Sequence, residues 1–463
     1  MRSVRGVSLA VLLVVLPAAA RADAPAARRP NVLIIVGDDM GYADVGFHGC
    51  TDIPTPHLDG LARDGVRFTA GYVSGPYCSP TRAGLLTGRY QTRFGHEFNP
   101  AGGDDGLPLA EHTLADRLAA AGYATGLVGK WHLGTRPEMQ PQRRGFADFY
   151  GFLGGAHDYF DRDGILRGTE PVAKLDHTTD DFGREAVDFI RRHAGKPWFL
   201  CLAFNAVHTP MQATEERLAR FAGIADPRRR TYAAMMVAMD DAVGRVREAL
   251  AASGQEQDTL VAFISDNGGP TMPGTTGNGS RNAPLRGSKR TTLEGGIRVP
   301  FVVAWPGRIQ PGVYERPVIQ LDLHATALAA AGVEPRPEWR LEGVDLLPFL
   351  SGTRDAPPHD ALCWRFGGQM AIRAGDWKLV RYDATVDGDR AAGVVGPRLY
   401  DLQSDVGETR DLAATMPDTV RDLQARWDAW DEANVAPLWG QAQRGGPRRA
   451  AGEGRRRRPA ATP

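Results

Sequence analysis

The sequence is poor in cysteine: its 463 residues include four, Cys50, Cys78, Cys201 and Cys363. These four stand far apart, without a Cys-x-x-Cys pair or zinc-like spacing, which argues against a structural zinc site. An even number permits disulfides, but four cysteines do not form a disulfide scaffold in a chain of this length. Cys201 lies in an apolar run, where a small buried side chain is expected. Cys78 lies instead in the polar stretch CSPTR. Neither burial in a core nor a structural zinc site explains a cysteine at this position.

The chain also lacks net charge and any long apolar segment beyond its N-terminus. Its 55 Lys and Arg balance 55 Asp and Glu, so bulk charge indicates no particular partner, and no nucleic acid is expected. Arg2 and Arg5 precede the apolar run VSLAVLLVVLPAAA and then small residues, which predicts a signal peptide over residues 1–24. This run is short for a transmembrane helix, and an uncleaved anchor is the alternative. We therefore expect an exported protein, periplasmic or secreted, without a transmembrane segment after cleavage.

Composition divides the rest of the chain into three segments. Residues 30–352 alternate apolar runs with helical patterns and are predicted to form the main domain. Residues 353–440 are predicted to form a smaller subdomain, because 370–383 indicates two short strands around a Gly-Asp turn and an amphipathic helix follows. Residues 441–463 carry seven arginines against one acid, Glu453. This predicts a disordered basic tail, with contact to polyanions or an anionic surface as the alternative.

The main domain is predicted to be α/β. Its candidate strands are continuous, β-branched apolar runs, as buried parallel strands are, and they span 31–36, 124–129, 198–204, 259–265 and 299–305. Helical patterns lie between them, for example over 112–122 and 230–254. We predict a large, mostly parallel central sheet flanked by helices on both faces, with a small antiparallel sheet plus helix in the C-terminal subdomain.

Four of these strands end in polar side chains. Their carboxyl ends lead into Asp38 and Asp39, Lys130 and His132, Asn205 and His208, and Asp266 and Asn267. A single Asp-Asp or Asp-Asn-Gly is more often a turn, but four such endings are hard to explain as turns alone. Because ligands of open α/β sheets bind at the carboxyl ends of the strands, we expect these side chains to form one site.

The acidic side chains of this site suit a hard cation. Asp38, Asp39, Asp266 and Asn267 offer only oxygen ligands, which Ca²⁺ and Mg²⁺ prefer, whereas zinc favours histidine or thiolate. Without a cation, the carboxylates would repel one another and become hard to ionise together.

The stretch GPYCSPTRAGLLTGRY places Cys78 where a helix is predicted to begin. Ser79 suits the N-cap and Pro80 the first helical position. Residue 78 then lies at the positive helix end, where a bound anion is favoured, and Arg82 on the first turn would face that anion. On physics alone, Cys78 is a low-pKa thiolate nucleophile. A thiolate is, however, a poor match for a carboxylate-bound hard cation.

The motifs of the chain resemble those of the sulfatase family. CSPTR matches the family's Cys-x-Pro-x-Arg signature, LLTGRY continues it, and GYATGLVGKWHLG matches the second signature. Other family blocks are resembled, in order over roughly residues 30–415, by NVLIIVGDDMGYADVGFHG, AFNAVHTP, SDNGG, LRGSKRTTLEGGIRVP and LYDLQSDVGETRDLA. The resemblance implies an alkaline-phosphatase-like fold with residues 30–352 as its catalytic domain. It also implies that a formylglycine-generating enzyme converts Cys78 to formylglycine during export.

The resemblance further implies which residues bind the cation and the sulfate. One divalent cation, usually Ca²⁺ and alternatively Mg²⁺, is implied to lie among Asp38, Asp39, Asp266, Asn267 and the modified residue 78. The sulfate is implied to lie against cationic side chains that offset its charge in the transition state, and these are Arg82, Lys130 and Lys289.

Proton transfers are implied as well. Asp266 is implied to activate a hydroxyl of hydrated formylglycine for attack on sulfur, and His208, helped by Lys289, to protonate the departing alcohol. His132 is implied to take the proton from the second hydroxyl, so that sulfate leaves and the aldehyde returns. A simple serine or cysteine sulfate ester would lack this exit.

Three further residues lie in predicted loops that we expect to rim the pocket and contact substrate: His96, His157 and Asp158. The implied function is an exported sulfuric ester hydrolase acting on a sulfated small molecule or glycan, either a carbohydrate sulfate or an aryl sulfate. The alternatives are a phosphoester or phosphonate ester hydrolase of the same superfamily, and a non-catalytic protein that binds sulfated glycans.

Overall fold

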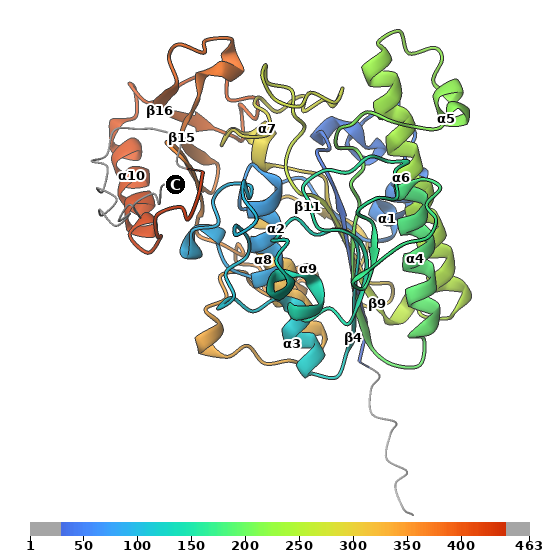
Figure 1. The fold of residues 1–463 in the computed structure, drawn as a ribbon. Coiled ribbons are helices and arrows are strands. Elements are labelled where there is room, and N and C mark those ends of the chain that lie inside the picture. The colour runs from blue at the N-terminus through green and yellow to red at the C-terminus, as the bar shows by residue number, and fades with distance from the viewer. Residues whose placement is uncertain (1–28, 441–463) are drawn as a thin grey trace, which may run out of the picture.

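The computed structural model describes residues 29–440, so the predicted signal peptide and the predicted basic tail lie outside the described residues. The chain forms a ten-stranded mixed sheet with helices on both faces and, beside it, a four-stranded antiparallel sheet (Figure 1). The fold class predicted from the sequence is thereby confirmed.

The large sheet has a parallel centre and mixed edges, in the order β11-β2-β10-β9-β1-β8-β4-β5-β6-β7. The parallel strands are β9 (Thr259–Ser265), β1 (Asn31–Gly37), β8 (Trp198–Ala203), β4 (Ala124–Lys130) and β5 (Asp148–Phe152). The edge strands are β10 (Phe301–Ala304), β2 (Val66–Phe68), β11 (Gly312–Tyr314), β6 (Leu166–Arg167) and β7 (Glu170–Pro171). The run at 299–305 therefore contains a strand, but that strand lies antiparallel to β9.

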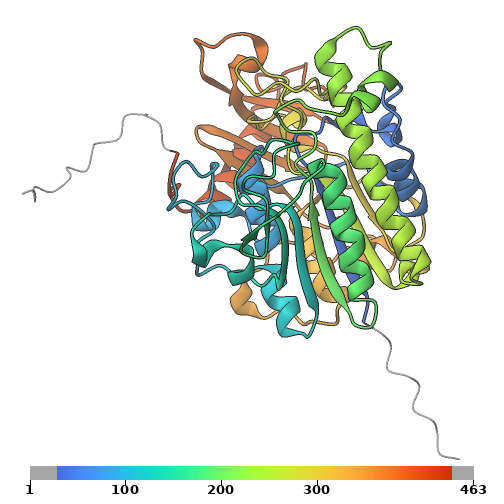
Figure 2. The same ribbon diagram turned by 45° about the vertical axis from the view of Figure 1, so that its right-hand side comes forward.

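The central strands are buried on both faces because alternate side chains enter two different apolar cores. In β1, Leu33 and Ile35 enter one core, and Val32, Ile34 and Val36 enter the other. The first core is covered by α1 (Pro56–Asp64), α4 (Thr178–Arg192) and α6 (Pro227–Ala252). The second is covered by α2 (Cys78–Thr87), α3 (Leu114–Ala120) and α8 (Leu321–Ala330). Figure 2 shows α4 and α6 side by side on the first face.

Short elements complete the main domain. They are α5 (Glu215–Arg220), α7 (Glu294–Ile297), α9 (Leu347–Leu350) and the paired strands β3 (Gly71–Tyr72) and β12 (Val318–Ile319). Between residues 29 and 440, no helix is both long enough and apolar enough to cross a membrane.

The smaller sheet lies between the main domain and α10 (Pro417–Asp431) (Figure 1). Its strands are β13 (Leu362–Phe366), β14 (Gln369–Ala374), β15 (Trp377–Asp383) and β16 (Val394–Asp401). The predicted Gly-Asp turn joins β14 to β15, and Gly375 has a φ of +59° there, a left-handed value that glycine adopts without strain. Trp364 and Val380 pack toward the main domain, while Ile372 and Leu379 pack toward α10.

A buried ion-paired group joins the smaller sheet to the main domain. Lys378 Nζ of β15 lies 2.9 Å from Glu294 Oε1 in α7 and 2.8 Å from Glu408 Oε1, and all three side chains are fully buried. Glu408 also accepts the backbone N–H of Glu294 at 2.7 Å. Burial raises the pKa of Glu408 to about 7, with the charge of Glu294 adding to the effect and Lys378 opposing it.

We expect Glu408→Gln to change how stability depends on pH. Because the folded pKa of Glu408 lies above the ordinary value of 4.5, its proton stabilises the fold below pH 4.5, and this contribution is lost as the pH rises through about 7. Relative to Glu408→Gln, the wild-type chain should lose on the order of 1–3 kcal/mol of unfolding free energy between about pH 5 and pH 8. Urea unfolding at several pH values measures the difference, and parallel profiles for the two chains would contradict the assignment.

Candidate active site

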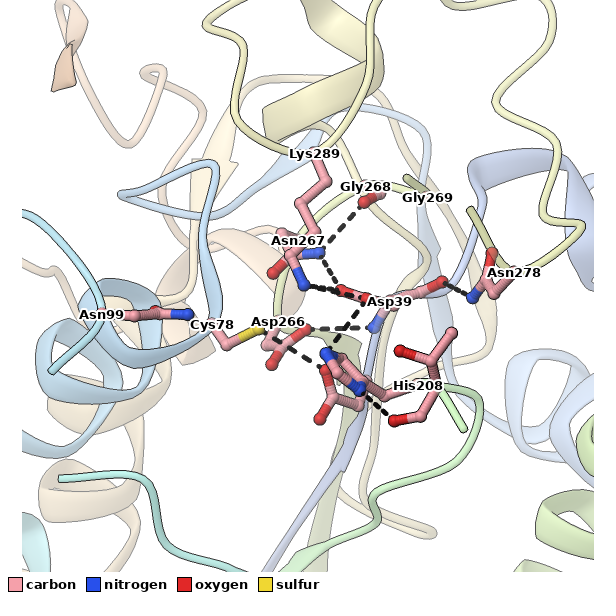
Figure 3. A network of polar contacts seen from close by, with 12 residues as sticks. Asp39, Cys78, Asn99, His208, Asp266, Asn267, Gly268, Gly269, Asn278 and Lys289 are labelled. Carbon is pink, nitrogen blue, oxygen red and sulfur yellow. Dashed lines mark hydrogen bonds and ion pairs between the residues drawn. The ribbon is translucent and has the colours of Figure 1, made fainter. Parts of the chain in front are cut away.

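The carboxyl ends of β9, β1, β8 and β4 lie next to one another, since these strands are neighbours and parallel. Gly37 at the end of β1 pairs with Ser265 at the end of β9, so Asp38 and Asp266 leave the sheet at the same level. Figure 3 shows Asp39, Asp266, Asn267 and His208 gathered on one side of Cys78, with Lys289 reaching in from a separate loop. The structure thus brings the polar strand endings together, as the sequence predicts.

Three buried carboxylates pair with three buried cations at the centre of the site. The ion pairs, given as nitrogen-to-oxygen distances, are Lys130–Asp38 at 2.5 Å, Lys289–Asp39 at 2.7 Å and Arg82–Asp266 at 2.9 Å. Their charges cancel within the chain. A divalent cation added to this set would leave two positive charges, which would draw an anion into the site. The site is therefore suited to an anionic substrate when a cation is bound.

Burial and ion pairing set the pKa values of the three carboxyl groups. Burial opposes ionisation of Asp38 and Asp39. Nearby cations outweigh it, chiefly Lys130 for Asp38 and Lys289 for Asp39, so both pKa values lie below the ordinary value. Burial, and then the charge of Asp38, raise the pKa of Asp266. Without a bound cation, Asp266 is therefore the carboxylate of the three that holds a proton most readily.

Helix α2 begins at Cys78 rather than at Pro80, and the prediction that Ser79 is its N-cap is wrong. The N-cap is Tyr77, whose side chain makes no capping hydrogen bond. Asn99 supplies the acceptor instead, since its Oδ1 accepts the Ser79 N–H at 3.0 Å from a position 20 residues along the chain. The local prediction fails because a tertiary partner satisfies the helix terminus.

Cys78 is buried among the charged groups. Its Sγ lies 3.6 Å from Asp38 Oδ1. Burial raises the pKa of the thiol to about 12, in spite of the nearby cations Lys130 and Lys289. The prediction of a low-pKa thiolate is therefore wrong, because burial outweighs the helix terminus and the cations together. An unmodified Cys78 is a poor nucleophile in this site.

His132 and His208 differ in which ring nitrogen is already hydrogen-bonded and which is free to exchange a proton. His132 is buried with a φ of +59°, and its Nδ1 has no hydrogen-bond partner among residues 29–440. Burial above all lowers its pKa well below the ordinary value, so the ring is neutral and able to accept a proton. The Nδ1 of His208 lies 2.6 Å from the Thr209 carbonyl and must donate a proton to it. Its Nε2 lies 3.6 Å from Asp39, facing the site.

His96 does not rim the site, contrary to the prediction. Its side chain is fully buried, and its Nε2 donates to the Ser79 hydroxyl at 2.6 Å, while that hydroxyl donates to the His132 carbonyl at 2.6 Å. Trp439 packs edge-on against the ring at 4.7 Å. Burial lowers the pKa of His96 to about 3. His96 therefore supports the start of α2, and substrate contact by His96 stays a prediction.

His157 and Asp158 are engaged by neighbouring residues of their own loop and by Gln212. The ring nitrogens of His157 lie 2.6 and 2.9 Å from the carbonyls of Asp158 and Asp163. The Asp158 carboxylate accepts from the Phe160 N–H at 2.8 Å and from Gln212 Nε2 at 2.6 Å. Substrate contact by His157 and Asp158 stays a prediction.

The residues at the strand ends fit a hard divalent cation. Asn267 Oδ1 is buried without a hydrogen-bond partner in the described part of the chain, while its Nδ2 donates to Asp39 at 2.7 Å. Ligand atoms of Asp38, Asp39, Cys78 and His208 lie within 4.8 Å of one another. An unpaired carbonyl oxygen beside carboxylates is the kind of group that Ca²⁺ or Mg²⁺ satisfies. The thiol is the softest ligand here, and an oxygen-bearing side chain at position 78 would match the others better.

Side chains from distant loops hold the site in shape, and the sequence did not single them out. Asn278 Nδ2 donates to the carbonyls of Asp39 and Val207, at 3.0 and 2.9 Å, where Asp39 has a strained φ of +61°. The Tyr159 hydroxyl lies 2.9 Å from the His208 carbonyl. No local pattern marks such residues, because each acts on backbone that is remote in sequence.

Two family models match the chain. One, described as Sulfatase, matches residues 30–333, and one described as N-sulphoglucosamine sulphohydrolase, C-terminal, matches residues 287–428. Arylsulfatase A of Bos taurus is 36% identical over 453 residues, covering 86% of this chain and 87% of its own. N-acetylgalactosamine-6-sulfatase of Canis lupus familiaris is 35% identical over 398 residues, covering 79% and 74%. The solved structure of Ps i-CgsB in complex with k-i-k-neocarrahexaose superposes with a TM-score of 0.82 at 35% identity, over 89% of this chain and 95% of that one.

Proposed function

Because this chain belongs to the sulfatase family and is a sulfuric ester hydrolase, we propose that it removes sulfate from a sulfated carbohydrate. We propose further that residue 78 acts as formylglycine and that a divalent cation, Ca²⁺ in preference to Mg²⁺, is held by Asp38, Asp39, Asp266 and Asn267. The observation that carries the proposal is a buried residue 78 among three carboxylates and three cations. The choice of a carbohydrate is supported by one relative named as an N-acetylgalactosamine-6-sulfatase and one structure in complex with a neocarrahexaose.

The chain's own residues bind and orient the sulfate. When present, hydrated formylglycine supplies one hydroxyl that attacks sulfur and a second whose deprotonation releases sulfate. Arg82, Lys130 and Lys289 lie around the side chain of residue 78 and offset the charge on the sulfate oxygens as the ester bond breaks. Since these cations are buried, their interaction with the developing charge is weakly screened.

Protons are moved by three further atoms. Asp266, whose pKa burial raises, takes the proton of the attacking hydroxyl. The Nε2 of His208 gives a proton to the ester oxygen that leaves as the alcohol. His132 is neutral and has an unpartnered Nδ1 among the described residues, so it is suited to take the proton that accompanies sulfate release.

The proposal includes maturation and export. The signal-like segment at residues 1–24 supports export to the periplasm or medium. During export, a formylglycine-generating enzyme would convert Cys78. Fractionation of cells that express the full chain should place the activity in the periplasm or medium, and activity confined to the cytoplasm would contradict this part.

The reaction class is tested with paired aryl sulfate and aryl phosphate substrates that share one leaving group. We expect the exported protein with Ca²⁺ to hydrolyse the sulfate at least about tenfold faster in kcat/KM. Faster hydrolysis of the phosphate would favour a phosphoester hydrolase instead. Binding of sulfated glycans without any turnover would favour a non-catalytic protein.

A further inference from the structure

Tyr77, the residue before Cys78, has no role in the proposed chemistry and is the centre of a cluster of aromatic and cationic side chains. Its ring centroid lies 5.4 Å from Lys289 Nζ and 5.9 Å from the guanidinium carbon of Arg290. The ring of Phe366, from β13, meets it edge-on at 5.8 Å. One aromatic ring therefore joins the start of α2 to two cations and to the smaller sheet.

Arg290 is held in an unfavourable backbone conformation. Its φ is +73°, in the left-handed region where a residue other than glycine is strained. Its N–H donates to the Pro76 carbonyl at 2.7 Å, and its carbonyl accepts from Gln369 Nε2 at 2.9 Å. The fold thus keeps an arginine where glycine would fit with less strain. Strain of this kind gathers at ligand sites.

The guanidinium of Arg290 is placed to meet an anion. The residue is exposed, within residues 29–440 its side chain forms no ion pair, and its guanidinium lies over the Tyr77 ring. Arg365, in β13 of the smaller sheet, differs from Arg290 in having ion-pair partners, since it pairs with Glu97 and Asp431, each at 2.8 Å. The charge of Arg365 is therefore neutralised within the chain, whereas that of Arg290 is not.

A cavity adjoins this cluster. It has a volume of about 560 Å³, and its walls include Phe98 and Phe366, whose ring centroids lie 5.0 Å apart. Phe366 contacts both the cavity and Tyr77. Apolar rings beside polar groups are typical of small-molecule sites, and a space of this size accommodates a sugar.

We propose that Arg290 is a specificity-determining residue that binds a second anionic group of the substrate, a sulfate or a carboxylate, beside the ester that is hydrolysed. The inference rests on the proposed function and narrows the substrate to carbohydrates with at least two anionic groups. The planar guanidinium binds sulfate or carboxylate oxygens in a fork, and the Tyr77 ring keeps it oriented. Tyr77 and Phe366 would then pack against the sugar ring that carries the second group.

The test compares Arg290→Gly with wild type. Glycine removes the guanidinium and relieves the strain at a φ of +73°, so the variant is expected to fold. Arg308→Gly is the matched control. Arg308 is also exposed, and its guanidinium carbon also lies 5.9 Å from a ring centroid, that of Trp305. The probes are N-acetylgalactosamine and neocarrabiose, each carrying one or two sulfate esters. Each probe is used as a competitor of aryl sulfate hydrolysis and, independently of turnover, as a ligand in thermal unfolding.

We expect wild type and Arg308→Gly to bind the disulfated form of at least one probe about tenfold or more tightly than the monosulfated form. In Arg290→Gly this ratio should fall to about one, and in wild type it should shrink with added salt. An equal ratio in Arg290→Gly and wild type, or an equal loss in Arg308→Gly, would overturn the inference. Hydrolysis of the aryl sulfate by both chains, together with an unchanged binding ratio in Arg290→Gly, would overturn this inference alone. If wild type does not hydrolyse the aryl sulfate but still binds the disulfated probe more tightly, and Arg290→Gly does not, the proposed function would be overturned instead.

Discussion

Replacing Cys78 by alanine is expected to abolish sulfate ester hydrolysis while leaving the fold intact. The side chain is buried, and within residues 29–440 its thiol makes one hydrogen bond, to Asp38 at 3.6 Å. Alanine therefore removes little from the folded chain. It removes all of the proposed nucleophile, so kcat should fall by at least about 10,000-fold, as when the nucleophile of a serine protease is removed. Thermal unfolding and turnover of an aryl sulfate, measured on the same preparation, separate the two effects.

Cys78→Ser separates attack on sulfur from release of sulfate. A serine hydroxyl suits a hard cation, but a serine sulfate has no second hydroxyl through which sulfate can leave. At most one equivalent of alcohol per enzyme is therefore expected in a rapid-quench experiment. In the active wild-type protein, mass spectrometry should find residue 78 about 18 Da lighter than cysteine. A plain thiol in active protein, or full turnover by Cys78→Ala, would contradict the proposed role.

The centre of the site could be predicted because it depends on strand ends alone. Apolar runs identify β1, β4, β8 and β9, and each strand ends in a polar side chain or reaches one within two residues. Parallel strands that are neighbours bring these endings to one edge, whatever the loops do. Asp38 and Asp266 therefore meet as expected, and Trp131, between Lys130 and His132, is buried in the core as strand alternation requires.

The surroundings of Cys78 could not be predicted, because they depend on distant loops. Local preference favours Ser79 as the N-cap, but Asn99 takes that role from another part of the chain. His96 lies in a polar stretch that suggests exposure, yet Trp439, far along the chain, packs against it. The thiol pKa depends on the depth of burial, which no helix pattern reveals. Sequence patterns thus predict which groups meet, whereas tertiary packing decides how each of them is protonated.

Replacing Arg82 by alanine is expected to weaken both stability and catalysis. Arg82 is buried, and its guanidinium donates to Asp266 at 2.9 and 3.1 Å and to the Lys130 carbonyl at 3.3 Å. Alanine leaves a buried carboxylate without this partner, which lowers the unfolding free energy by about 3–5 kcal/mol. It also removes a charge that faces the sulfate, which lowers kcat by about 100- to 1,000-fold. Arg82→Lys keeps the charge but loses the fork, so its losses should be intermediate.

A divalent cation should change the size of this stability effect. With Ca²⁺ bound, Asp266 has a second positive partner, so Arg82→Ala should destabilise the chain less in Ca²⁺ than in EDTA, as measured by urea unfolding. Arg89→Ala is the control, because Arg89 lies just beyond the end of α2 and pairs with Glu111 at 2.7 Å outside the site. This pair does not touch the site, so the loss of unfolding free energy in Arg89→Ala should be the same in both conditions. Equal losses for Arg82→Ala with and without Ca²⁺ would mean that Arg82 and the cation do not share the charge of Asp266, and the cation would then have to bind elsewhere.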